Sequence, residues 1–406
     1  PYDEIDPGKG PKNNNYPAQC LVYDNLIHSI GLYEKQITGV ELSMCQAITV
    51  SHNSIYDTPR AGINISEGTW GGHILEFNDI FDTVKETGDH GSFNSWGRDR
   101  YWHPKYKEME SIAAKDPALI LADATQTTIM RNNRFRCDRG WDIDLDDGSS
   151  NYHIYNNLCL NGGIKLREGF YRVVENNIMI NNSFHPHVWF NNSGDVFTRN
   201  IVMTEYKPIS VREWGLMVDY NIFTDSMSYA AAIKNKTDEH SIVTSVQFRN
   251  PSEGDFTIPD DSEAITKGGF HNFVMDQFGV VSPRLKAIAH TPKMPAPIMI
   301  ADHAGSDITD WCGATIKSLQ TLGERSATGM DSERGVYVIS VNALGGKLRD
   351  YIRPNDVIVR IGTTPVNNLR EMQEVLQKVD KSKEVEFIIF RTQKENKIVI
   401  PGKLLD

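Results

Sequence analysis

Four aspartates gather in residues 140–148, which run Gly-Trp-Asp-Ile-Asp-Leu-Asp-Asp-Gly. Asp142, Asp144 and Asp146 alternate with two apolar residues, and Asp147 follows directly. Alternation with a period of two predicts a strand that buries one face, so the opposite face of this strand carries carboxylates. Neighbouring carboxylates repel each other and raise at least one of their pKa values, a property common in sites that perform acid–base chemistry.

Hydrolysis of a glycosidic bond is the first chemistry that this segment fits. A glycoside hydrolase needs one carboxylic acid that stays protonated and one carboxylate that is ionised. Same-face neighbours on a strand lie about 7 Å apart, which suits an inverting reaction, whereas a pair about 5 Å apart across adjacent strands suits a retaining one. We take Asp144 and Asp146 as the working pair, with Asp142 and Asp147 as further catalytic candidates, and leave acid and base unassigned.

A calcium-dependent polysaccharide lyase is the second chemistry. Asp142, Asp144 and Asp146 would bind Ca²⁺ through oxygen ligands, and Lys165 or Arg167 would abstract a proton. The segment loosely resembles a calcium loop, but its aspartates alternate along a strand, whereas a calcium loop wraps around its ion. We therefore expect a site without a metal or cofactor and keep Ca²⁺ as the alternative.

The elements that position these aspartates belong to a repeat. An asparagine followed two places later by an apolar residue recurs at Asn25, Asn53, Asn78, Asn133, Asn157, Asn177, Asn200 and Asn221. A period just above about 20 residues with short alternating segments predicts a solenoid. Asparagine suits its corners because it tolerates a left-handed backbone and bonds to its own main chain. The longer interval before Asn133 predicts two coils or one coil with an insertion.

The alternating segments predict a stack of parallel strands about 4.8 Å apart. They are residues 62–68, 140–148, 163–169, 186–192 and 208–214. Aligning their apolar pairs places Lys165 beside Asp144 and Arg167 beside Asp146. The substrate-binding candidates on this face are Glu67, Lys165, Arg167, Glu168, His187, Trp189 and Arg212. A paired, solvated surface is the alternative, but Asp, Arg, His and Trp are the residue types of a saccharide or catalytic cleft.

Residues 88–103 are rich in glycine, aromatic and ionisable residues, and we predict an insertion here and not a coil. A long loop inside a compact solenoid is usually functional. We expect it to form the wall of the cleft, with His90 and Arg98 contacting substrate and with Trp96, Tyr101 or Trp102 as a platform on which a sugar stacks. The Lys/Glu mixture of residues 104–116 predicts a solvated helix or loop tip.

Composition narrows the class of partner. The net charge is −11, which argues against a nucleic-acid backbone as partner. No apolar run approaches the length of a membrane span. The five cysteines form no CxxC motif, so neither a zinc site nor a disulfide framework is expected. The first residues, Pro1-Tyr-Asp-Glu-Ile-Asp, are neither a signal peptide nor a natural start, so we expect a processed or trimmed chain.

The composition changes near residue 309. Residues 335–341 predict a strand, residues 348–366 a turn, a strand and a hairpin, and residues 368–378 a helix. The string Gly-Val-Tyr-Val…Ile-Arg-Pro-Asn-Asp-Val-Ile…Ile-Gly-Thr-Thr-Pro-Val before this helix resembles a bacterial PDZ domain. The resemblance implies an extended peptide bound by strand addition beside residues 335–341 and the helix. The alternative is a structural cap without a peptide ligand.

Upstream, the Asn-marked coils resemble the right-handed parallel β-helix of carbohydrate-active enzymes. Together with the aspartate strand and the PDZ-like domain, they are similar to glycoside hydrolase family 141, whose members include an α-L-fucosidase and a xylanase. The resemblance transfers no individual catalytic residue. It implies an all-β chain with a β-helix catalytic domain over residues 1–281, a proline-containing linker over 282–308 and an α+β PDZ-like domain over 309–406.

The expected function is therefore a glycosidase that acts on a polysaccharide or oligosaccharide. Such a substrate implies a periplasmic, cell-surface or secreted protein. A non-catalytic surface protein that binds glycans or peptides is the alternative from another class, and it predicts binding without release of sugar.

Overall fold

The computed structural model describes residues 10–66, 70–97, 99–297, 308–320, 324–325, 328–341, 347–392 and 394–405. Glu67 and Arg98, two of the predicted substrate-binding residues, lie outside these ranges. The chain forms two compact units, Pro1–Met299 and Ile300–Asp406, which we describe separately. No described helix is both long and apolar enough to cross a membrane.

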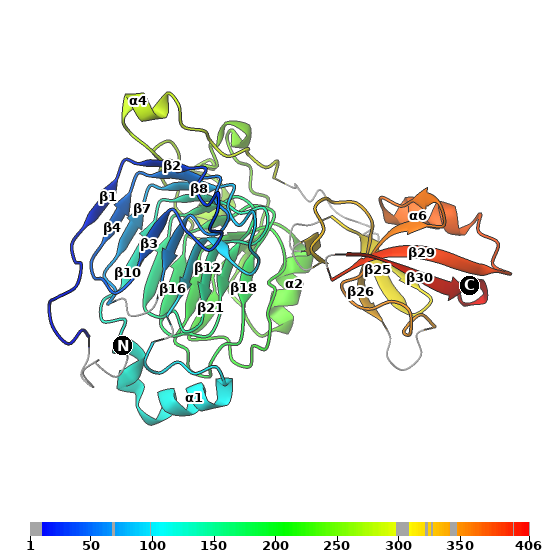
Figure 1. The fold of residues 1–406 in the computed structure, drawn as a ribbon, viewed down its shortest axis with the longest axis horizontal. Helices are drawn as coiled ribbons and strands as arrows, with labels where there is room; N and C mark the ends of the chain where they lie inside the picture. Colours follow the sequence, from blue (N-terminus) through cyan, green and yellow to red (C-terminus); the bar gives the residue numbers. More distant parts are fainter. Residues whose placement is uncertain are drawn as a thin grey trace. The chain divides into compact units, whose positions relative to one another are not determined.

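The first unit is a β-helix built from three parallel sheets (Figure 1). The first sheet contains β1 (Leu21–Tyr23), β4 (Thr49–Ser51), β7 (Ile74–Glu76), β10 (Thr128–Arg131), β13 (Tyr152–Tyr155), β16 (Arg172–Glu175), β19 (Val196–Thr198) and β21 (Met217–Asp219). The second contains β2 (Leu26–His28), β5 (Ser54–Tyr56), β8 (Asp79–Phe81), β11 (Arg134–Arg136), β14 (Leu158–Cys159), β17 (Ile178–Met179), β20 (Ile201–Val202), β22 (Ile222–Phe223) and β23 (Ile242–Val243). The predicted fold class is confirmed.

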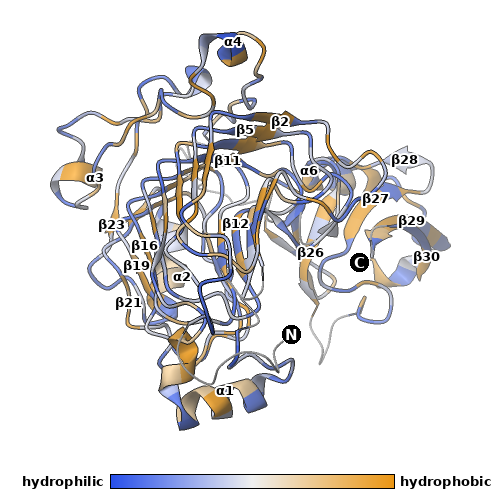
Figure 2. Cartoon of the chain, turned by 60° about the vertical axis from the view of Figure 1, so that its left-hand side comes forward, coloured by the Kyte–Doolittle hydropathy of each residue, from blue (hydrophilic) through white to orange (hydrophobic). Residues whose placement is uncertain are grey.

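The third sheet carries the aspartate segment. It contains β3 (Val40–Leu42), β6 (Ile63–Ile65), β9 (Gly91–Trp96), β12 (Trp141–Asp146), β15 (Ile164–Leu166) and β18 (Phe184–Pro186). Apolar side chains of all three sheets fill the space between them, and Ile143, Leu145, Ile164 and Leu166 are completely buried. Figure 2 shows orange, apolar positions interspersed with blue, polar ones along the coils, as half-buried strands require.

The recurring asparagines form a ladder between the first and second sheets. Nδ2 of Asn133 donates to Oδ1 of Asn157 at 3.0 Å, and Oδ1 of Asn133 accepts from Nδ2 of Asn78 at 3.0 Å. The same amide-to-amide bond joins all eight, from Asn25 to Asn221. The left-handed residue of the corner is the one before the ladder asparagine, such as Asn132 with a φ of 52°. The ladder amide instead bonds to backbone groups that the corner leaves unpaired.

The prediction that residues 88–103 are an insertion is wrong. Gly91–Trp96 is strand β9, which pairs with β6 and β12 as an ordinary part of a coil. The interval between Asn78 and Asn133 is one coil that carries an insertion after β9. This insertion includes α1 (Tyr106–Lys115) and η2 (Pro117–Leu121). Of the two alternatives predicted for residues 104–116, the structure has the helix and not the loop tip. Met109 and Ala113 bury one side of α1 against the coils, and Figure 2 shows that polar and apolar residues alternate along this helix.

Helix α2 (Ser226–Lys234) packs on the interior core through Ala232 and Tyr229. The chain after β23 instead packs along the outer face of the second sheet and contains η3 (Pro251–Glu253), α3 (Glu263–Thr266) and α4 (Pro283–Lys286). Phe256 and Phe270 are buried against outward-facing residues of the second sheet such as Leu158. The part predicted as a linker also contacts the coils, because the His290 ring stacks on Tyr56 with centroids 5.2 Å apart.

The second unit is an antiparallel sheet with the strand order β24-β25-β26-β27-β29-β30, and β28 pairs with β27. Its elements are β24 (Thr309–Trp311), β25 (Ala314–Ser318), β26 (Val336–Val341), β27 (Val357–Ile361), β28 (Thr364–Pro365), α6 (Leu369–Leu376), β29 (Glu384–Arg391), β30 (Lys394–Pro401) and η4 (Gly402–Leu404). Asn368 caps the amino-terminal end of helix α6, because its side chain accepts a hydrogen bond from the Glu371 N–H at 2.9 Å.

Replacing an interior ladder asparagine tests how much the ladder stabilises the β-helix. Asn133→Ala removes a completely buried amide and leaves the amides of its neighbours unpaired, so we expect the free energy of unfolding to fall by about 1–3 kcal/mol. Asn25→Ala, at the partly exposed end of the ladder, is the matched control and should have a smaller effect. Urea unfolding followed by circular dichroism measures both, and equal losses would contradict the interpretation.

Candidate active site

The outer face of the third sheet carries one continuous column of polar residues. Strand pairing places Glu41, Asn64, Asn94, Asp144, Lys165 and His185 side by side on successive strands. The predicted register between β12 and β15 is confirmed, since Ile143 faces Ile164 and Asp144 faces Lys165. The polar side chains of this column are held in place because the alternate positions belong to the apolar core.

The ammonium of Lys165 lies among three carboxylates. Its Nζ is 3.1 Å from Asp144 Oδ1 and 3.5 Å from Asp146 Oδ1. Asp89, which precedes β9, contributes a third carboxylate at 3.5 Å. Nζ also lies 4.0 Å from the centre of the Trp141 ring, a cation–π contact. The Lys165 side chain is only 2% exposed, so its charge is compensated by these neighbours and hardly by water.

Asp144 is the most buried member of this group. Its side chain is 0% exposed, and among the described residues neither of its carboxylate oxygens has a partner with hydrogen-bond geometry. Burial raises the pKa of Asp144 to about 8, Asp146 and Asp89 add to the increase, and Lys165 opposes it. Because a charged carboxylate is costly to bury and Lys165 compensates only part of this cost, the Asp144 carboxyl holds a proton far more readily than an aspartate in water.

Arg167 contacts three carboxylates, one of which, Asp146, also lies beside Lys165. Burial lowers its pKa, but the carboxylates of Glu168, Asp146 and Asp147 raise it more, so the guanidinium stays charged. Its Nη1 is 3.4 Å from Asp146 and 4.0 Å from Asp147, and its Nε is 2.6 Å from Glu168. Burial raises the pKa of Glu168, and Arg167 opposes the increase. The predicted neighbours Asp146 and Arg167 therefore do meet.

Asp142 does not join the group, which corrects its assignment as a catalytic or calcium-binding residue. Its carboxylate accepts hydrogen bonds from the backbone N–H groups of Cys137, Asn161, Gly162 and Gly163 at 2.7–3.2 Å. Burial raises the pKa of Asp142 to about 7, against the effect of these donors. The side chain organises the turns that precede β12 and β15, since it satisfies backbone donors that would otherwise be buried unpaired.

His187 and Trp189 do not continue the outward column as predicted. Strand β18 ends at Pro186, and Val188 has a left-handed φ of 54°. The turn reverses the predicted alternation, so Trp189 is completely buried and its indole N–H donates to the backbone oxygen of Leu166 at 2.9 Å. It is a core residue and cannot stack on a sugar.

His185 takes the position beside Lys165 that the prediction missed. The rings of His185 and His187 lie 6.3 and 6.1 Å from that of Trp141. His187 thus still lies near the site, but it follows the end of β18 and is not part of the predicted strand. Burial lowers the pKa of His187 to about 4 and that of His185 well below its usual value, so both rings are neutral at pH 7. The alternation Phe184-His185-Pro186 was the sequence signal for this strand.

Arg212 also lies outside the column. The described residues 208–214 form no strand apart from a single bridge between Ile209 and His187. The Arg212 side chain is exposed, and its guanidinium lies 5.8 Å from the centre of the Tyr106 ring on α1. This contact links Arg212 to the inserted helix, so its assignment as a substrate-binding residue of the aspartate face is wrong.

His90 and Trp96 lie beside the group, at the two ends of β9. His90 Nδ1 is 3.0 Å from Thr87 Oγ1, and burial, helped by Arg60, lowers the pKa of His90 to about 4. Trp96 pairs in register with Asp146, and the Arg60 guanidinium lies 4.7 Å from the centre of its ring. Both residues are therefore close to the carboxylates, as part of a coil and not of a loop.

A calcium site finds no support in the donor arrangement. Among the described residues, no group of three histidine, cysteine or acidic side chains is placed to hold a metal ion. Asp142 is engaged by backbone N–H groups, and Lys165 occupies the space between Asp144 and Asp146. An ammonium already neutralises the charge that Ca²⁺ would neutralise.

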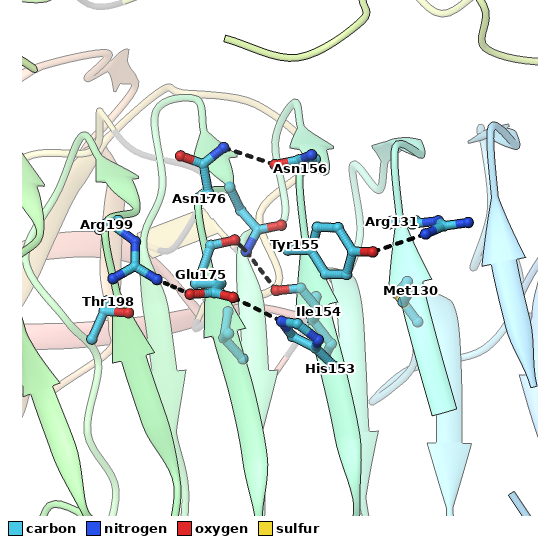
Figure 3. A network of polar contacts seen from close by, with 12 residues as sticks. Met130, Arg131, His153, Ile154, Tyr155, Asn156, Glu175, Asn176, Thr198 and Arg199 are labelled. Atoms are coloured by element: carbon cyan, nitrogen blue, oxygen red, sulfur yellow. Dashed lines mark hydrogen bonds and ion pairs between the residues drawn. The ribbon is translucent and has the colours of Figure 1, made fainter. Parts of the chain in front are cut away.

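Another polar network shows what a paired surface looks like on the same solenoid (Figure 3). On the outer face of the first sheet, Glu175 lies 2.8 Å from His153 and also pairs with Arg199. Arg131 donates to Tyr155 at 3.0 Å. These groups are partly exposed and have aligned partners. The Lys165 group differs because Lys165 and Asp144 at its centre are buried and because it holds more carboxylates than cations.

No curated protein matches the chain. A family model, described as PDZ domain, matches residues 313–401. This match agrees with the antiparallel sheet and helix of the second unit, and the C-terminal part of the chain is therefore a PDZ domain.

Proposed function

We propose that the β-helix is a glycoside hydrolase whose reaction takes place on the Asp146 side of Lys165. The observation that carries the proposal is the convergence of Asp144, Asp146 and Asp89 on one buried ammonium. Carboxylates held close together, with at least one in a protonating environment, are what glycosidic hydrolysis requires.

Exposure divides the roles within this group. The side chains of Asp146 and Asp89 are 16% and 70% exposed, whereas that of Asp144 is fully covered. Asp146 and Asp89 are therefore the carboxylates that a substrate can touch. Their oxygens are each 3.5 Å from Lys165 Nζ, so they lie no farther apart than twice that distance. This limit admits the separation of about 5–5.5 Å used for retention and the lower end of the inverting range.

Asp144 acts as a positioning residue in this scheme. Its buried carboxyl holds the Lys165 ammonium in place, and Lys165 in turn holds the carboxylates of Asp146 and Asp89 near each other. Burial makes Asp144 retain a proton near neutral pH. That proton is the source for a general acid, while an outer carboxylate serves as base or nucleophile.

The lyase alternative is less well supported, because a lyase needs a deprotonated side chain that accepts a proton from the sugar. The carboxylates around Lys165 raise its pKa despite its burial, and those around Arg167 do the same. Both side chains therefore stay protonated at neutral pH, and neither can accept a proton from a sugar carbon.

Substitution of the outer carboxylate tests the proposal. Asp146→Asn should reduce the release of reducing sugar from the responsive member of a panel of plant, algal and host polysaccharides by about 10²–10⁴-fold. Asp138→Asn, an exposed aspartate paired with Arg136, is the control and should retain activity. Circular dichroism and thermal unfolding confirm that each variant folds. Hydrolysis by Asp146→Asn at the wild-type rate would refute the assignment.

The raised pKa of Asp144 predicts the pH dependence. Since Asp144 retains a proton up to about pH 8, kcat/KM should fall as the pH rises through that value. In Asp144→Asn the fall should move or disappear, because the titrating carboxyl is gone, even where some activity remains. A high-pH limb that is identical in both proteins would show that Asp144 does not control the proton.

Stability gives a check on the same proton that needs no substrate. The folded chain binds the Asp144 proton more tightly than the unfolded chain, whose aspartates titrate near about 3.9. Stability should therefore fall as the pH rises from about 4 to about 8, and this contribution should be absent in Asp144→Asn. Denaturant unfolding of both proteins across this range measures the difference, and parallel curves would contradict it.

We propose peptide binding as a second function, located in the PDZ domain. The predicted acceptor strand, residues 335–341, is less suitable, because β26 pairs with β25 along its length on one side and with β27 through Val336 and Tyr337 on the other. Strand β25 is the better acceptor. The N–H of Leu369 at the start of α6 donates to Ser318 Oγ on β25 at 2.9 Å, and among the described strands only β24 pairs with its outer edge, from Ala314 to Ile316.

Hydrogen–deuterium exchange distinguishes the two strands. A peptide selected from a library on the full chain should protect amides of β25 and α6, because strand addition forms new backbone hydrogen bonds there. Protection confined to β26, or failure to select any peptide, would contradict this location.

A further inference from the structure

We propose that the substrate is a glycan without carboxylate groups, and that one of its sugar units sits in a hollow beside Trp96. The hollow is lined by Gln36, Ile37, Thr38, Glu41, Arg60 and Trp96. This inference rests on the proposed hydrolase function and adds to it the direction of the substrate and its chemical class.

The hollow is large enough for a sugar unit. Its volume is about 480 Å³, within the about 300–1,000 Å³ typical of small-molecule sites. Its lining combines an aromatic ring with hydroxyl, amide and charged groups. Aromatic rings with a few well-placed polar groups are the usual composition of ligand pockets, and this mixture suits a ring that has both apolar faces and hydroxyls.

The hollow lies next to the carboxylates that surround Lys165. Trp96 on β9 is the register partner of Asp146 on β12, so one wall of the hollow adjoins the carboxylate that we assign to the reaction. Glu41 on β3 lies three strands from β12, a distance of about 14 Å at the usual strand spacing. A bound chain therefore runs across the strands, from the hollow to Asp146.

Polar side chains line the floor between these two points. Asn64 on β6 lies between Glu41 and Asn94 in the register. Its amide nitrogen donates to both Glu41 oxygens at 2.9 Å, and Nη2 of Arg60 donates to Asn94 Oδ1 at 3.0 Å. Oδ1 of Asn64 is buried and has no hydrogen-bond partner among the described residues. The floor is thus ordered, and Glu41 is left exposed at the mouth of the hollow.

The charges along this path select against an anionic sugar. The described carboxylates are Glu41, Asp89, Asp144, Asp146, Asp147 and Glu168. The described cations are Arg60, Lys165 and Arg167, and each already has a partner: Arg60 bonds to Asn94 and contacts Trp96, whereas the other two contact carboxylates.

Among the residues of this path that the structure describes, carboxylates therefore outnumber cations. His90 and His187 add no charge at neutral pH, since their pKa values lie at about 4. A uronate would meet net negative charge among these residues, and Arg60, which bonds to the neutral amide of Asn94, offsets only part of it. Binding of a uronate is therefore less favourable than binding of a neutral sugar.

Calorimetric titration of the full chain tests the inference directly. The probes are the neutral hexasaccharides of xylose, glucose, mannose and N-acetylglucosamine, with hexagalacturonate as the anionic comparison. We expect at least one neutral probe to bind and hexagalacturonate to bind at least 10-fold more weakly or not at all. Chromatography of each mixture registers hydrolysis separately, so binding without products would overturn the hydrolase proposal and leave this inference standing.

Two variants locate the binding site. Trp96→Ala removes the ring, and Thr38→Trp fills the hollow from its rim without changing the core, so each should weaken binding of the neutral probe by at least 10-fold. Tyr220→Ala, an exposed aromatic on another part of the solenoid, should bind normally. Equal or tighter binding of hexagalacturonate, no binding of any neutral probe, or unchanged binding by both folded variants would each overturn the inference.

Discussion

The fixed spacing of the parallel strands is the constraint on which the rest of the first unit depends. Each coil must place its strand directly beside the previous one, because backbone hydrogen bonds and the asparagine ladder join equivalent positions. Once the register is fixed, every outward side chain has one neighbour on each side. An aspartate that lies next to a lysine is therefore a property of the stack and not of a flexible surface.

This constraint also explains how the fold tolerates an unfavourable arrangement of charges. Asp144, Asp146 and Lys165 sit on strands whose alternate residues are completely buried in the core. Moving their side chains apart would require moving Ile143, Leu145 or Leu166 out of the packed interior. The apolar core thus maintains the electrostatic strain, which is the usual origin of perturbed pKa values at reaction centres.

Some of this register can be predicted from the sequence, and some of it cannot. The ladder and the pairing of β12 with β15 were predictable because asparagine and alternating isoleucine and leucine mark them plainly. Strand β9 was missed because Ser95 occupies the inward position that Ile65 and Leu145 hold in neighbouring strands, which breaks the apolar alternation.

Two other errors have related causes. In residues 184–190 two alternations overlap, and the turn at Val188, which decides between them, has no sequence signal. Asp142 alternates like Asp144, and only the surrounding backbone donors distinguish the two. Asp89 joins the group from a preceding turn, where no strand alternation marks it.

The segment after α2 has a mechanical consequence. A stack of coils in which each contacts only its neighbours can fray from an open end. Here Asp24, in the first corner of the solenoid, accepts hydrogen bonds from the backbone N–H groups of Val281 and Ser282 at 2.7 and 3.1 Å. Residues 281–282, near the end of the first unit, are thus hydrogen-bonded to its first coil. Unfolding that starts at the amino-terminal coil must first break these contacts. The coils therefore unfold cooperatively and not one after another.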